Sequence, residues 1–239
     1  MSVLFVIALC LAGIAALILP YYCMLTYRGK TQKTLILKMI LSSTFAISAI
    51  LAVFSVKARG AYAYIMLAGF LVSVAGDYLL GKSERMRVFV AGSCCFAAAH
   101  ILYIIALSLA SRTILSGQIR WFNGMEAGIY IALVSAVLLI ALLRRPPFHK
   151  LFIPMFAYYF ILCLMVTKAF GLGIRWVGDF PSMIMLPIGA AFFLCSDYML
   201  GMMRFKMHAR NVPFKTFCTA SYFAAQTLMA LSLFTIVSL

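Results

Sequence analysis

Two aspartates inside apolar runs are the side chains of this sequence best suited to chemistry. Asp77 lies in Gly-Asp-Tyr-Leu-Leu-Gly at 76–81, and Asp197 lies in Ser-Asp-Tyr-Met-Leu-Gly at 196–201. An Asp at the centre of a membrane helix costs about 2.5–3.5 kcal/mol, so such carboxylates normally face a bundle interior or a wet cavity. Two carboxylates close together at low dielectric constant share a proton, which provides one acid and one base. For each aspartate, the alternative is a helix-end residue that reaches the membrane interface.

Polar side chains also follow two helical faces. Two stripes, each spaced i, i+4 and i+7, comprise Phe96, His100 and Tyr103, and Tyr222, Gln226 and Met229. We expect a cavity lined by the polar members His100, Tyr103, Tyr222 and Gln226, although a lone histidine is as often a packing residue. Tyr158 either lines the same cavity or packs in the core. Lys38 either meets a lipid phosphate or extends to the interface.

The sequence contains a partial internal repeat. The two aspartate segments share four of six residues at an offset of 120, and segments 96–100 and 222–226 match at an offset of 126. This pattern predicts two four-helix halves, about 1–120 and 121–239, within one polytopic domain over 1–239. Four spans return the chain to its starting side, so the halves are expected to be parallel, with both aspartates at one depth. The alternative is chance similarity between apolar helices.

The composition indicates a membrane protein. Of 239 residues, 66% are hydrophobic and only 10% are charged, whereas soluble domains have roughly 45–50% apolar and 25% charged residues. Eight apolar runs predict an all-α bundle of eight transmembrane helices, at about 2–25, 35–56, 61–81, 88–110, 126–143, 149–170, 181–203 and 213–237. A separate soluble domain and a nucleic-acid-binding module are excluded.

The basic residues predict the orientation of the chain. The net charge is +15, and the connections after the first, third, fifth and seventh runs carry 14 of the 20 Lys and Arg. By the positive-inside rule these connections are cytoplasmic, and both termini lie on the opposite side. We expect the excess charge to contact anionic membrane lipids rather than nucleic acid.

The sequence lacks the patterns of several enzyme classes. The seven cysteines show no CxxC or zinc-ligand spacing, so we expect neither metal nor another cofactor. GxSxG, HExxH and P-loop motifs are also missing, which disfavours serine lipases, zinc proteases and ATP-driven pumps. The other acids, Glu84, Glu126 and Asp179, are read as members of loops or helix ends.

Four segments together resemble one family. VAGDYLLG, AAAHILYIIAL, GAAFFLCSDYMLG and SYFAAQTLMALS are similar to the YhhN-like family of integral membrane lysoplasmalogenases. The matching residues include Asp77, His100, Asp197 and Gln226, while Lys38-Met39 departs from the Lys-Pro frequent in that family.

The resemblance implies hydrolysis of the vinyl ether bond of a lysoplasmalogen, a single-chain phospholipid. The products are a fatty aldehyde and a glycerophospho-base. Protonation of the vinyl β-carbon gives an oxocarbenium ion, which suits paired carboxylates as in glycosidases. The sequence leaves open which Asp is the acid and the oligomeric state. A transporter or a non-enzymatic lipid-binding protein is the alternative, since parallel repeats also occur in transporters.

Overall fold

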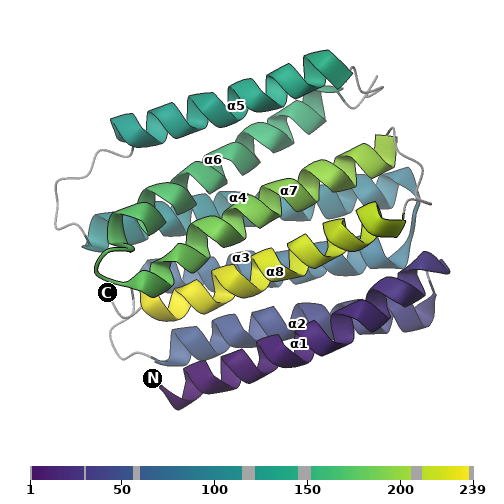
Figure 1. Cartoon of the computed structure of the whole chain (residues 1–239), viewed down its shortest axis with the longest axis horizontal. Helices are drawn as coiled ribbons and strands as arrows, with labels where there is room; N and C mark the ends of the chain where they lie inside the picture. Colours follow the sequence, from purple (N-terminus) through teal and green to yellow (C-terminus); the bar gives the residue numbers. More distant parts are fainter. Residues whose placement is uncertain are drawn as a thin grey trace.

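The computed structural model describes residues 2–29, 31–55, 60–114, 122–144, 152–205 and 212–236. Within these ranges the fold is all-helical, with eight α-helices, one short 3₁₀ helix and no strand (Figure 1). The elements are α1 (Val3–Tyr27), α2 (Gln32–Ser55), α3 (Ala61–Lys82), α4 (Met86–Ile114), α5 (Gly124–Arg144), α6 (Phe152–Trp176), η2 (Pro181–Ile184), α7 (Met185–Phe205) and α8 (Val212–Ile236).

Seven helices of the described chain are long and apolar enough to cross a membrane, which indicates a multi-pass membrane protein. The expected eight helices are present, and the eighth, α5, is apolar over Gly124–Ile140 within the residues that the structure describes fully. The sixth helix extends to Trp176 rather than to residue 170. Because no water is available in a bilayer core, each backbone must satisfy its own polar groups, and helices achieve this locally.

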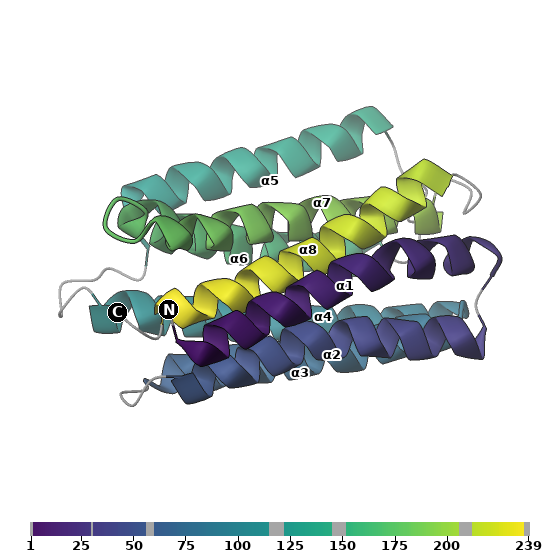
Figure 2. The same ribbon diagram turned by 60° about the horizontal axis from the view of Figure 1, so that its bottom comes forward.

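The helices form a bundle in which sequence neighbours are also spatial neighbours. Contacts join α1 to α2, α2 to α3 and α3 to α4, and likewise α5 to α6, α6 to α7 and α7 to α8. Three contacts connect more distant parts of the sequence: α2 with α8, α4 with α6, and α1 with α8. Figures 1 and 2 show both chain termini at the same end of the bundle.

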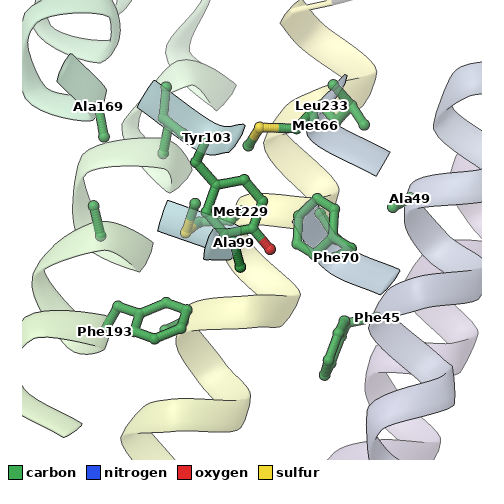
Figure 3. Close-up of a cluster of buried hydrophobic side chains, with 14 of the residues drawn as sticks. Phe45, Ala49, Met66, Phe70, Ala99, Tyr103, Ala169, Phe193, Met229 and Leu233 are labelled. Carbon is green, nitrogen blue, oxygen red and sulfur yellow. The ribbon is translucent and has the colours of Figure 1, made fainter. Parts of the chain in front are cut away.

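The core of the bundle is centred on Tyr103, which is fully buried (Figure 3). Its ring lies 5.2 Å from that of Phe70 on α3, and Phe193 and Met229 bring α7 and α8 to the same core. Gly69 allows this arrangement, because a Cβ there would collide with the Tyr103 ring. Small residues of this kind let membrane helices approach closely.

A buried ion pair fastens α5 to the bundle. Lys168 Nζ on α6 lies 2.9 Å from Glu126 Oε2, and both side chains are 7% exposed. Glu126 also takes part in a capping box, since its backbone N–H donates to Asn123 Oδ1 and its carboxylate accepts from the Asn123 N–H. Glu126 is therefore a helix-end acid, as expected from the sequence, and it is also buried and paired with Lys168.

Candidate active site

A cavity of about 240 Å³ opens among the ends of the helices, and both Asp77 and Asp197 line it. It lies where α1 leads into α2, α3 into α4 and α7 into α8, which is the end of the bundle opposite the termini in Figure 1. Apolar walls come from several helices, with Leu80, Phe96 and Phe223 among the lining residues. Small-molecule sites usually have mostly apolar walls and a few polar groups, and this cavity with its two carboxyls has that composition.

Asp77 accepts three donors and is 1% exposed. Lys38 Nζ on α2 lies 3.0 Å from Oδ1, while Ser42 Oγ and Tyr222 OH each donate to Oδ2 at 2.6 Å. Lys38 and Ser42 are four residues apart and therefore share the face of α2 that meets α3. An ionised carboxylate is acceptor-only, and this arrangement of an ammonium and two hydroxyls satisfies it.

A chain of hydrogen bonds extends from Asp77 into the core. Gln226 Nε2 donates to Tyr222 OH at 3.2 Å, and Tyr103 OH donates to Gln226 Oε1 at 3.4 Å. Ser73 Oγ lies 3.3 Å from the Tyr103 hydroxyl and ends the chain. The two polar stripes expected on the fourth and eighth helices therefore converge, and they hold the Tyr222 hydroxyl toward Asp77.

Asp197 has a different set of partners. Tyr158 OH on α6 donates to Asp197 Oδ2, and His100 Nε2 on α4 lies 3.5 Å from the same oxygen. Tyr159 OH donates to the Asp197 backbone carbonyl at 3.4 Å. Among the described residues, Asp197 Oδ1 has no hydrogen-bond partner, so one oxygen of this cavity-lining carboxyl is available to a ligand.

His100 completes a second chain. Its Nε2 lies 3.2 Å from Tyr158 OH, and its ring packs edge-on against Phe193 with centroids 4.8 Å apart. Nδ1 is buried and has no partner within the described part of the chain. A neutral imidazole with its proton on Nε2 leaves only a lone pair at Nδ1, which avoids burying an unpaired N–H. In this tautomer His100 donates to Tyr158, and Tyr158 donates to Asp197.

The predicted site residues fall into two groups. Asp77, Asp197 and Tyr222 line the cavity, and Tyr158 lines a much smaller neighbouring cavity of about 20 Å³ together with Asp197. The expectation that the three polar residues His100, Tyr103 and Gln226 line the cavity is not met. All three are 0% exposed and are not among the lining residues. Gln226 donates to the cavity-lining Tyr222, His100 lies 3.5 Å from the cavity-lining Asp197, and Tyr103 lies one step further away, bonded to Gln226.

Sequence reasoning singled out Lys38 but not its contact with Asp77, and it missed Ser42. Lys38 lies 120 residues before Tyr158, the same offset that separates the two aspartates, and this spacing could have identified its place in the site. Ser42 carried no signal beyond its place one helical turn after Lys38. Glu84 lies in the loop between α3 and α4, as expected, and it also lines the cavity.

The described residues contain no group of three or more His, Cys, Asp or Glu arranged to hold a metal ion. The cavity-lining residues offer carboxylates, phenols, two lysines and an arginine, and the buried imidazole of His100 lies beside Asp197. Two carboxyl groups, one fully hydrogen-bonded and one with a free oxygen, could act as a charge stabiliser and a proton donor respectively.

Comparison with known proteins gives a family. A model of the YhhN family matches residues 34–233, a range that includes all the site residues described above. No curated protein and no solved structure matches the chain.

Proposed function

The chain belongs to the YhhN family, and from this premise we propose that it hydrolyses the vinyl ether bond of lysoplasmalogens to a fatty aldehyde and a glycerophospho-base. The observation that carries the proposal is the pair of carboxyls on one cavity in unlike surroundings. Vinyl ether hydrolysis needs a proton donor at a carbon atom and a negative group beside the cation that results. Asp197 on α7 and Asp77 on α3 would supply them, held in place by residues of α2, α4, α6 and α8.

We assign the acid role to Asp197. Its Oδ1 has no hydrogen-bond partner among the described residues, so a proton there can point into the cavity while Oδ2 accepts from Tyr158. In the first step this proton moves to the vinyl β-carbon, and a lone pair of the ether oxygen stabilises the resulting cation as an oxocarbenium ion. General acid catalysis by one positioned group accounts for about 10²–10⁴-fold of rate.

Asp77 takes the role of the ionised partner. Its three donors fix the carboxylate in place, and the Lys38 ammonium lies 3.0 Å from its Oδ1. Across the cavity it stabilises the cation and orients a water molecule. The water adds to the cationic carbon and passes a proton to Asp197, which restores that carboxylic acid.

The hemiacetal formed in this way then collapses. Asp197 protonates the glycerol oxygen as the carbon–oxygen bond breaks, and the hemiacetal hydroxyl returns its proton to the Asp197 carboxylate. One water is consumed, and the aldehyde and the glycerophospho-base are released. Neither an oxidant nor a reductant is needed.

The fold behind this site is proposed to consist of two parallel four-helix repeats. Support comes from equivalent neighbours in the two halves: α2 contacts α3 and α8, as α6 contacts α7 and α4. The neighbours of the two carboxyls also correspond. Lys38 contacts Asp77, and Tyr158, which lies 120 residues after Lys38, contacts Asp197. A Cβ on Gly81 would meet Leu35, and one on Gly201 would come near Met155, which keeps the same offset.

The basic connections support a cytoplasmic position for the cavity mouth, with both termini on the other side. Accessibility of single cysteines placed at Lys33 and Ser2 to a membrane-impermeant thiol reagent, in a variant lacking the native cysteines, tests this orientation. Labelling from the outside at Lys33 but not at Ser2 would reverse it.

Turnover by the purified protein tests the proposed reaction. Aldehyde should be released from a lysoplasmalogen but not from lysolipids of the same chain length with a saturated ether or an ester. Binding of all three lipids without aldehyde release would instead favour a transporter or a lipid-binding protein.

A further inference from the structure

Two cations at the cavity mouth form no ion pair with a carboxylate of the described residues. Lys215 Nζ on α8 donates to the backbone carbonyl of Thr26 at 2.6 Å, and Arg204 Nη2 on α7 donates to the backbone carbonyl of Glu84 at 2.6 Å. Neither takes part in an ion pair in the described part of the chain. Backbone carbonyls fix the orientation of these two side chains without neutralising their charge. The mouth therefore presents two positively charged groups in fixed positions.

Arg204 is positioned for an additional acceptor. Its guanidinium lies over the Phe89 ring at 5.2 Å from the centroid, which limits its movement. Its Nε is buried and has no partner within the described residues. A buried guanidinium N–H without an acceptor is unfavourable, and an anionic oxygen in the cavity would satisfy it.

Glu84 does not fill this role. It is the acid at the mouth, but Arg204 bonds its backbone oxygen rather than its carboxylate. No ion pair joins the Glu84 carboxylate to Arg204 or Lys215 in the described structure, although Glu84 is near enough to attract Lys215 electrostatically. Deeper in the cavity, the charge of Lys38 is matched by Asp77. The mouth therefore has two positive groups and one carboxylate, which leaves one positive charge in excess there.

We propose that Arg204 and Lys215 bind the phosphate of a lysophospholipid whose ether end lies between Asp77 and Asp197. This inference rests on the proposed function and adds the group by which the substrate is recognised. Arg and Lys are the usual phosphate-binding side chains, Arg through a fork of N–H donors and Lys as a point charge. The lipid tail extends beyond the cavity, because about 240 Å³ is less than the roughly 300–1,000 Å³ of typical small-molecule sites.

The spacing along the helices fits such a molecule. Arg204 follows Asp197 by seven residues on α7, and Lys215 precedes Tyr222 by seven on α8, which is roughly 10 Å at 1.5 Å per residue. Seven covalent bonds, each roughly 1.5 Å long, separate the phosphorus from the vinyl β-carbon, and their zigzag spans about 9 Å. Phosphate at the mouth thus places the reacting carbon at the depth of the carboxyls.

Equilibrium binding of a non-cleavable probe tests the proposal independently of turnover. The probe is a lysophospholipid with a saturated alkyl ether. The comparison ligand is an alkylglycerol with the same chain but without the phosphate. Arg204→Gln and Lys215→Gln should each weaken lysophospholipid binding about 10-fold or more and leave alkylglycerol binding unchanged. Lys215→Arg should retain most of the affinity. Lys33→Gln, an exposed cation at the same end that does not line the cavity, is the matched control.

Three results would overturn the assignment. The first is unchanged lysophospholipid affinity in both Gln variants, and the second is an equal loss for alkylglycerol, which would indicate damage to the cavity. The third is inorganic phosphate bound as tightly as the lipid, which would indicate a site for a free anion. Vinyl ether turnover is measured in parallel. A protein that binds the probe through phosphate but releases no aldehyde would reject the proposed reaction and keep the phosphate site.

Discussion

Lys38 Nζ lies 3.0 Å from Asp77 Oδ1, and each residue belongs to a helix long and apolar enough to span a membrane. Their side chains are 13% and 1% exposed. The residue 120 positions after Lys38 is Tyr158, whose hydroxyl donates to Asp197. One carboxyl of the cavity thus has an ammonium as its neighbour, and the other has a phenol and an imidazole.

Asp77→Asn and Asp197→Asn should each reduce aldehyde release about 10²–10⁴-fold, because asparagine keeps the shape but can neither donate the proton nor carry the charge. The measurement is turnover of lysoplasmalogen by purified variants. Asp179→Asn, in the exposed turn after α6, is the control and should retain native turnover. Near-native activity of either cavity variant would remove that residue from the mechanism.

Lys38→Met should lower stability by about 1–3 kcal/mol, because it leaves the Asp77 carboxylate buried without its cation. Asp77→Asn alone should also destabilise, since the ammonium then loses its partner. The double variant should recover most of the loss, because removing both members of a buried pair is often nearly neutral. Thermal unfolding of the native protein, the two single variants and the double variant in detergent gives the coupling free energy between Lys38 and Asp77. Strictly additive losses would mean that the two groups do not interact energetically.

Tyr158→Phe should lower kcat about 10- to 100-fold with little change in KM, because the Tyr158 hydroxyl stabilises the Asp197 carboxylate that forms as the proton leaves, and a hydrogen bond to a charged group contributes about 1.5–3 kcal/mol. Tyr159→Phe is the matched control. Its hydroxyl bonds the Asp197 backbone carbonyl rather than the carboxyl, so its effect on kcat should be under about threefold. Equal effects of the two substitutions on kcat would show that the Tyr158 contact with the carboxyl has no special role.

Lys168→Met should destabilise the protein by about 3–5 kcal/mol, because Glu126 is left as a buried unpaired charge. The pair joins α5 to α6 toward the end of the bundle that carries the termini, away from the cavity (Figure 1). Turnover per folded molecule should therefore stay near the native value. Thermal unfolding and activity, corrected for the folded fraction, separate these effects. A loss of turnover with unchanged stability would connect this pair to the cavity.

Much of the architecture could be predicted from the sequence, because it depends on local properties. Apolar run length predicted eight helices close to their observed bounds, since a chain in lipid must satisfy its backbone within each segment. Seven of these helices are long and apolar enough to span a membrane within the described residues. Helical spacing also placed His100 and Tyr103 on one face, and motif resemblance identified the family that the comparison confirmed.

Pairing between helices was decided only by the tertiary structure. Periodicity assigns a residue to a face, but it does not determine which face of another helix it meets. The sequence thus left Lys38 as an interfacial cation and Glu126 as a helix-end acid, whereas packing gives each a buried partner of opposite charge. It also treated the two aspartates as near equivalents. Their difference arises because α2 and α8 supply a lysine and two hydroxyls to Asp77, while α4 and α6 bring an imidazole and a phenol to Asp197.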